Sequence, residues 1–529
     1  MIFTRTNLSY LPILLIIIYA FFINWISANV GVMPVDTFGF FDTGYSILKN
    51  KLPIRDFWAF SGIVIDYFQA FFFLIFGESW KSYIFHSSFI NVFASLSFYI
   101  FLINLKLNKI YSLLYTLSFA TLCYPVSGTP FSYNHSYVFS LICIFLLCVG
   151  IKNKNPFSWF ALPIVCFLAF FSMQTPSSYI FIVILIFSIY FFFNKKNHKN
   201  LKIFFLSSLG VFLFLLFYLI FTNTPFENFL YQYFLFPMTI GSERLGSNLS
   251  AYVTLSEQLN FNRLIGDFKY IHIFYLPLIF LTIKLFLKRE KNFLKITNLI
   301  IILSVFAFLF NQLVTANQIF IFSLIPLIAA ILHLNLEETK FKNIFLYSII
   351  LILCFITIKY HHRYNIERKF HDLENVDKSK AIDAEIISKK MKHLKWVTPH
   401  SEFTDPKKEL KIIQYVIDTL KLDTRKKTIV TNYQFFSVVL GEDLNLLNRW
   451  YLWGNDTHPT KGHKYFNFYK KMINENIEKN NIKVIYLLGQ HNEEIVFKDI
   501  EQYFTDKCFN SKTLIEGIFS HHEIIGCKN

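Results

Sequence analysis

The chain has 529 residues, of which 54% are hydrophobic and 16% are charged, and its formal net charge is +16. Apolar runs of roughly 17 to 25 residues recur along it, the length that crosses a bilayer core of about 30 Å. This composition excludes a soluble globular protein. Most of the positive charge of the membrane half lies in short loops, where it fixes orientation, so no nucleic acid is expected as a partner.

The first apolar run covers residues 9–28 and follows the amino end MIFTRTN. It has no small-residue cleavage site, so we expect a retained first helix rather than a signal peptide. Ten further spans are predicted at residues 83–104, 110–125, 134–151, 157–173, 178–193, 203–222, 271–287, 296–311, 318–334 and 343–359. The run 62–77 is short and contains Asp66 and Gln69, which predicts a helix in or near the interface instead.

The charge of the loops predicts which side of the membrane each loop occupies. Lysine and arginine concentrate in alternate loops, whereas PVSGTPFSYNHS, MQTPSS and QLVTANQ hold neither. If residues 62–77 do not span, the lysine-rich loops share the cytoplasm with Arg5. The first loop, about 29–82, the long loop, about 223–270, and the carboxy-terminal region then lie outside.

Residues 360–529 are predicted to form a separate soluble α/β domain after the membrane domain of residues 1–359. Charged residues become frequent there and no further spanning run occurs. Strands are expected at 427–432 and 482–489, alternating with helices at 406–420, 464–478 and 494–504, in a mostly parallel sheet. The stretch 361–390 is expected to be helical or loosely ordered.

Two of the seven cysteines, Cys508 and Cys527, lie in this soluble domain. An external, oxidising compartment would permit them to pair, but the sequence leaves the pairing open. The other five lie in or beside predicted spans, where cysteine acts as a small apolar residue.

The first external loop carries the most informative pattern, PVDTFGFFDTGYSILKNKLPIRDFW at residues 34–58, followed by the apolar run that ends in LIFGES. This pattern resembles the first external loop of the GT-C superfamily of membrane glycosyltransferases. More narrowly, it is similar to the bacterial branch related to protein mannosyltransferases and to lipid A and lipopolysaccharide sugar transferases. The likeness in topology extends to the external carboxy-terminal domain.

The resemblance implies a polytopic helical membrane fold with juxtamembrane helices in the first loop. It also implies a polyprenyl-phosphate sugar donor, a glycolipid, glycan or protein acceptor, and a place among the lipids of the bacterial inner membrane. Asp36 aligns with the catalytic aspartate of the family, whose carboxylate takes the acceptor proton. Arg55 and Arg244 are candidates to receive the lipid phosphate. No cofactor or metal is expected.

Other candidate substrate-binding residues carry weaker signals. Asp42 lies six positions after Asp36, about 240° around a regular helix, so the two are not expected to act as a pair. The further candidates are Asp56, which also suits a structural ion pair, and three residues of later external loops: Gln174, Tyr231 and Asn317.

The chain departs from the family at two places. Met173 replaces a lysine that often precedes the glutamine, and the loop 128–137 has no acidic residue. A lipid-linked glycan transporter or polymerase-like protein, or an inactive glycan-binding member, therefore remains an alternative. An ordinary solvated loop is the simplest structural explanation of the three aspartates.

Overall fold

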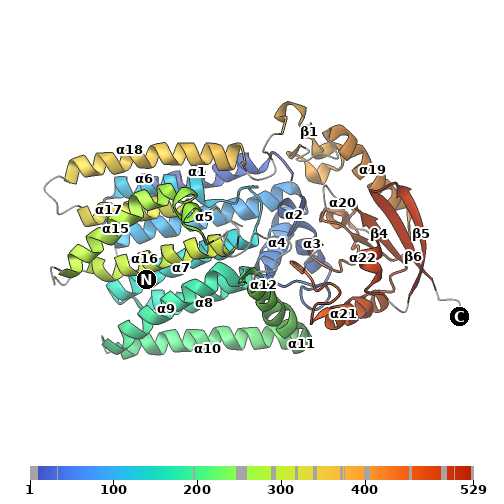
Figure 1. The fold of residues 1–529 in the computed structure, drawn as a ribbon, viewed down its shortest axis with the longest axis horizontal. Helices are drawn as coiled ribbons and strands as arrows, with labels where there is room; N and C mark the ends of the chain where they lie inside the picture. The colour runs from blue at the N-terminus through green and yellow to red at the C-terminus, as the bar shows by residue number, and fades with distance from the viewer. Residues whose placement is uncertain are drawn as a thin grey trace.

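The computed structural model describes residues 10–32, 34–194, 197–245, 259–287, 293–315, 320–336, 342–369, 373, 376–397, 405–451, 455–489, 497–504 and 507–525. The molecule is elongated, with a bundle of long helices at one end and a sheet-containing domain at the other (Figure 1). Short helices of the first external loop lie between these two parts (Figure 1).

The helical membrane fold expected from the sequence is confirmed. Within the described ranges, eight helices are long and apolar enough to cross a membrane. They are α1 (Tyr10–Ala28), α5 (Trp80–Asn104), α7 (Ser132–Asn153), α9 (Gln174–Asn194), α10 (His198–Phe221), α15 (Lys269–Leu287), α16 (Phe293–Val314) and α18 (Lys342–Tyr360). The remaining three predicted spans are shorter helices of the same bundle: α6 (Lys109–Cys123), α8 (Pro156–Ser172) and α17 (Leu324–Leu336).

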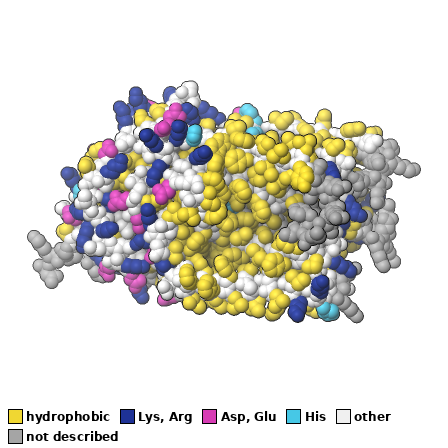
Figure 2. Space-filling view, turned by 180° about the vertical axis from the view of Figure 1, so that it is seen from behind, with side chains coloured by type: hydrophobic (Ala, Val, Ile, Leu, Met, Phe, Trp, Pro, Cys, Tyr) yellow, Lys and Arg dark blue, Asp and Glu magenta, His cyan; other side chains and the backbone are white. Residues whose placement is uncertain are grey.

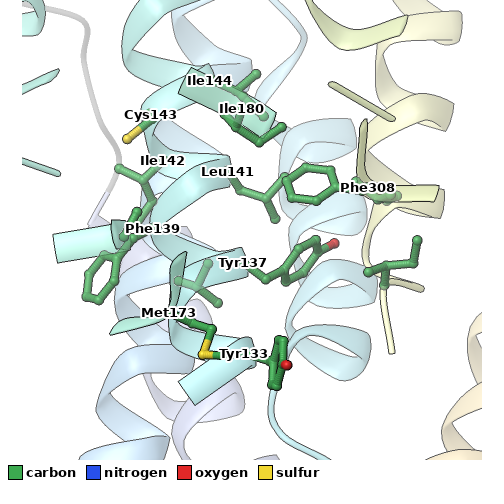
Figure 3. Packing of buried hydrophobic residues seen from close by; sticks show 14 of the residues in the cluster. Tyr133, Tyr137, Phe139, Leu141, Ile142, Cys143, Ile144, Met173, Ile180 and Phe308 are labelled. Atoms are coloured by element: carbon green, nitrogen blue, oxygen red, sulfur yellow. The ribbon is translucent and has the colours of Figure 1, made fainter. Parts of the chain in front are cut away.

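The surface of the bundle is apolar, as a lipid environment requires. A broad band of hydrophobic side chains covers it, while charged side chains gather over the sheet-containing end (Figure 2). Helix α10 is the most exposed of the long helices, with 11% of its apolar window buried. Inside the bundle, aromatic and aliphatic side chains pack together (Figure 3). The rings of Tyr137 and Phe308 pack edge to face, with their centroids 4.9 Å apart.

The first external loop folds into α2 (Pro34–Thr37), α3 (Phe41–Leu48) and α4 (Ile63–Phe76). Helix α4 has 14 residues and is about 21 Å long, which is too short to cross a bilayer core of about 30 Å. Gly62 precedes it at a φ of +73°. A Cβ atom at this position would collide with the ring of Phe40, so the backbone turn requires glycine here.

The long external loop contributes α11 (Phe226–Leu230), a turn of π-helix, η1 (Tyr231–Leu235), then α12 (Phe236–Leu245) and α14 (Phe261–Gly266). Pro225 precedes α11, where a proline fits because the first turn lacks hydrogen-bond acceptors for its N–H groups. Helices α11 and α12 lie between the bundle and the carboxy-terminal domain (Figure 1), whereas α14 packs against α15 and α16 of the bundle.

The carboxy-terminal domain is built on a sheet with the strand order β3-β4-β6-β5. Its strands are β3 (Lys427–Val430), β4 (Val484–Leu488), β5 (Cys508–Ile515) and β6 (Phe519–Ile525). Only β3 and β4 are parallel, whereas β6 is antiparallel to both β4 and β5, so the expected mostly parallel sheet is wrong. The reason is the short turn between β5 and β6, which forces a hairpin.

Four helices accompany this sheet: α19 (Pro406–Leu422), α20 (Phe436–Leu440), α21 (Phe466–Lys479) and α22 (Phe497–Glu501). Helix α19 starts where Asp405 accepts the N–H of Lys407, and it buries Leu410, Ile413 and Ile417 on one face. Two short strands, β1 (Ile382–Asp383) and β2 (Lys395–Trp396), pair within and just after the predicted helical or loose connection.

Cys508 is disulfide-bonded, and its expected partner Cys527 lies outside the described residues. The described thiols of the membrane half are free.

Candidate active site

Asp36 differs from the other aspartates of the first external loop in its exposure. It lies in α2, eight positions after the end of α1, and its side chain is half-buried. By contrast, Asp42 is 2% exposed, Asp56 is 4% exposed and Asp66 is fully buried. Asp36 is therefore the most exposed of these four carboxylates.

Asp42 joins the first external loop to the carboxy-terminal domain. Its carboxylate accepts the backbone N–H groups of Ser437 at 3.0 Å and Val438 at 2.9 Å, at the start of α20. Burial raises the pKa of Asp42 to about 7, although these two hydrogen bonds oppose the shift. Asp42 and Asp36 stand on separate helices, and the contacts of Asp42 show a docking role.

Arg55 and Asp56 form an ion pair at 2.6 Å. Arg55 also donates to the carbonyl oxygens of Thr222 and Asn50, so each nitrogen of its guanidinium group has a protein partner. The Asp56 carboxylate also accepts a hydrogen bond from Nζ of Lys479, on α21, at 2.9 Å. Burial raises the pKa of Asp56, but the hydrogen bonds from Arg55 and its neighbours outweigh burial and hold the pKa below its ordinary value.

Gln174 and Tyr231 also make contacts that hold the loops together. The Gln174 amide donates to the carbonyl oxygens of Phe60 at 2.8 Å and Tyr233 at 3.0 Å. Tyr231 stacks on Phe468 of α21, with ring centroids 4.1 Å apart. Among the remaining candidates, Asn317 and the side chain of Arg244 lie outside the described residues, while the backbone of Arg244 belongs to α12.

A buried ion pair that the sequence analysis missed connects Asp66 of α4 with Arg449 of the carboxy-terminal domain. Arg449 also donates to the carbonyl oxygen of Ser61, and its guanidinium group lies 4.8 Å from the ring of Phe40. Burial raises the pKa of Asp66 to about 6, against the opposing charge of Arg449. The sequence shows an aspartate inside an apolar run, but it gives no indication that Arg449 is the partner of this aspartate.

A short backbone pairing lies beside this ion pair. The N–H of Trp58 donates to the carbonyl oxygen of Leu447 at 3.0 Å, and the N–H of Arg449 donates to the carbonyl oxygen of Trp58 at 3.2 Å. The indole N–H of Trp58 reaches the carbonyl oxygen of Thr457. The first loop and the carboxy-terminal domain thus form one structural unit above the bundle.

Two buried histidines form a second pair that was missed, in the first two turns of α5 and α7. His86 and His135 face each other with their Nε2 atoms 3.2 Å apart. Nδ1 of His86 is hydrogen-bonded to the side-chain oxygen of Gln69 on α4, and Nδ1 of His135 is hydrogen-bonded to the carbonyl oxygen of Phe131. Among the described residues, no group of three or more metal-ligating side chains is arranged to hold an ion.

Several buried amide groups near the outer end of the bundle have no hydrogen-bond partner. Both polar atoms of the Asn311 and Gln312 side chains are in this state, and so is the Gln174 oxygen. Asn311 and Gln312 are each 1% exposed and lie in the last turn of α16. An unpaired buried polar group costs about 1–3 kcal/mol, so these amides carry unused hydrogen-bonding capacity.

No protein-family model matches the chain, and no curated protein matches it. Among solved structures, its fold is similar to the archaeal oligosaccharyltransferase AglB from Archaeoglobus fulgidus, in complex with an inhibitory peptide and a dolichol-phosphate. The TM-score is 0.44 and the identity 12%, over 98% of the present chain and 74% of the other. A similarity of this size assigns no activity.

Proposed function

We propose that the chain is a membrane glycosyltransferase of the GT-C type. It moves one sugar from a polyprenyl-phosphate-linked donor to a glycolipid, glycan or protein acceptor at the outer face of the bacterial inner membrane. The observation that carries this proposal is the partial exposure of Asp36 beside three aspartates that are buried in the docking of the carboxy-terminal domain.

The proposed reaction requires a base and a departing phosphate. The Asp36 carboxylate takes the proton of the acceptor hydroxyl or amine as the acceptor atom bonds to the anomeric carbon of the sugar. The bond between that carbon and the phosphate oxygen breaks, and the lipid phosphate leaves with the electron pair. An accessible aspartate at the membrane surface suits a substrate with a polar head and a lipid tail.

Cations must receive the leaving phosphate. Because the Arg55 guanidinium is engaged with Asp56 and two backbone carbonyl groups, Arg244 becomes the better of the two candidates in this proposal. The unpaired amides of Asn311 and Gln312 support a sugar-binding role, since amide groups pair readily with hydroxyl groups. Gln174 and Asn317 are the other residues that we propose to line the sugar-binding cavity.

One observation favours this function over transport. Asp66 lies in the first turn of the short helix α4 and pairs with Arg449 of the carboxy-terminal domain, and the His86–His135 pair lies in the first two turns of α5 and α7, whereas transporters place ionisable groups near the bilayer midplane. The disulfide at Cys508 supports an external, oxidising location for the carboxy-terminal domain.

The test is to replace Asp36 with asparagine and analyse cell-surface glycans by mass spectrometry. Loss of a general base lowers rates about 10²- to 10⁴-fold, so we expect the glycan to lose one sugar at unchanged protein abundance. Asp418→Asn, at an exposed acidic residue of α19, is the matched control and leaves the glycan intact. Unchanged glycans in both the Asp36→Asn strain and a full deletion would overturn the proposal.

A further inference from the structure

A cavity of about 510 Å³ lies where α18 leaves the membrane and continues into a turn of π-helix, η2 (His361–Ile366). Its apolar wall comes from Phe355 and Ile358, and its polar wall includes Lys359, Arg363 and Lys369. Turns of π-helix are rare and occur often at functional sites. The cavity is separate from the contacts of Asp42 and Asp66 described above.

The lipid-facing side of α18 leads directly into this cavity. Tyr347, Leu351, Phe355 and Ile358 are all more than half exposed and recur every three or four residues, so they form one stripe along the helix. Lys359 and Arg363 follow at the outer end of this stripe. An amphiphile lying along α18 would therefore bring its head group to these two cations.

The cations at this end of α18 contrast with three of the external loops. PVSGTPFSYNHS, MQTPSS and QLVTANQ contain no lysine or arginine, whereas the first and the long external loops contain both. Positive charge outside the membrane does not serve orientation, because that rule places it in the cytoplasm. Arg368 has a structural use, since it is buried and donates to the carbonyl oxygen of Ser27. The others need a different explanation.

In the polar wall, Lys359 and Arg363 carry positive charge and can form further hydrogen bonds. Lys359 donates to the hydroxyl of Tyr270 at 3.0 Å, a neutral partner that leaves its charge uncompensated. The Nε atom of Arg363 is buried without a hydrogen-bond partner. One carboxylate, Glu367, also lines the cavity and approaches His362 at 3.3 Å. With Lys359 and Arg363 beside one carboxylate, the polar wall complements an anion.

We propose that this cavity binds the phosphate head group of an anionic membrane lipid, whose chains lie along the exposed stripe of α18. The phosphate takes hydrogen bonds and charge from Lys359 and Arg363, and the apolar wall contacts the first carbons of the chains. This binding requires no sugar transfer, so the inference stands whether or not the proposed glycosyltransferase function holds.

Native mass spectrometry of the full chain in detergent tests the site with three probes: phosphatidylglycerol, a polyprenyl phosphate and the zwitterionic phosphatidylcholine. We expect the two anionic lipids to bind more tightly than phosphatidylcholine. In the variant Lys359→Gln/Arg363→Gln, this binding weakens about 30-fold, the change that corresponds to two surface charges. The more strongly affected anionic lipid identifies the source of the phosphate.

A matched control is Lys199→Gln/Lys202→Gln, which removes two exposed cations from the other end of the membrane, on α10. It should bind both anionic lipids as the unaltered chain does. Glu367→Gln provides a second variant that keeps both cations, and it should bind several-fold more tightly because a repelling carboxylate is gone. Equal lipid binding by the unaltered chain, the Lys359/Arg363 variant and the Glu367 variant would overturn the inference.

Discussion

Arg449 of the carboxy-terminal domain and Asp66 of α4 form an ion pair in which neither side chain is more than 1% exposed. Removing one member of such a pair leaves an uncompensated buried charge and costs about 3–5 kcal/mol, while replacing both with apolar groups costs much less. We therefore expect Arg449→Met to lower the thermal midpoint of the detergent-solubilised chain more than Asp66→Leu/Arg449→Met does.

Protease sensitivity of the carboxy-terminal domain during heating is the suitable readout for this prediction. Lys471→Met serves as the control, because the exposed pair of Lys471 and Glu475 on α21 contributes less than about 1 kcal/mol. If the double variant were as unstable as the single variant, the pair would not couple the two parts of the molecule.

Asp42 makes the docking of the carboxy-terminal domain depend on pH. Its pKa is about 7 in the folded chain and 3.8 when exposed, so the folded state binds the extra proton between these values. Stability should fall as pH rises from about 4 to about 7, and then level off. Thermal midpoints measured across this range should show the slope.

The variant Asp42→Asn cannot ionise at this position and should reduce the slope, while Asp66, whose pKa is also raised, keeps its own contribution. Asp418→Asn, at an exposed position on α19, should leave the slope as it is in the unaltered chain. An equal slope in Asp42→Asn and the unaltered chain would assign the pH dependence to other groups.

The stacked rings of Tyr231 and Phe468 connect the long external loop with α21. Stacked aromatic pairs contribute about 0.5–1.5 kcal/mol beyond the area they bury. A double-mutant cycle of Tyr231→Ala and Phe468→Ala should yield a coupling energy of this size in detergent unfolding measurements. Tyr231→Phe keeps the ring and should stay close to the unaltered chain, whereas additive effects of the two alanine variants would show that the rings do not interact.

The membrane half of the fold was predictable because the bilayer imposes a single length and polarity on every span. All eleven predicted runs are helices, and the short run around Asp66 is the non-spanning α4. Local signals also placed β3, β4 and α19. Sheet topology was harder, since the turn at Gly517 that makes β5 and β6 a hairpin was not recognised and β5 was not predicted.

The choice of candidate site residues followed local patterns in the sequence. Asp36 was ranked above Asp42 by its place in the pattern, and its greater exposure is consistent with that ranking. The docking roles of Asp42 and Asp66 depend on partners 395 and 383 positions away. No spacing rule reaches that far, so these carboxylates looked like ordinary loop residues or interfacial polar groups.

Because Asp66 and Arg449 are far apart in the sequence, the ribosome adds them to the chain at different times. At about 5–20 residues per second, roughly 20 to 80 s pass between the synthesis of the two residues. During this interval the buried aspartates and apolar side chains of the first loop lack their partners from the carboxy-terminal domain. A chain that stops before residue 449 cannot form the Asp66–Arg449 pair, so the docking of the first loop is completed only late in synthesis.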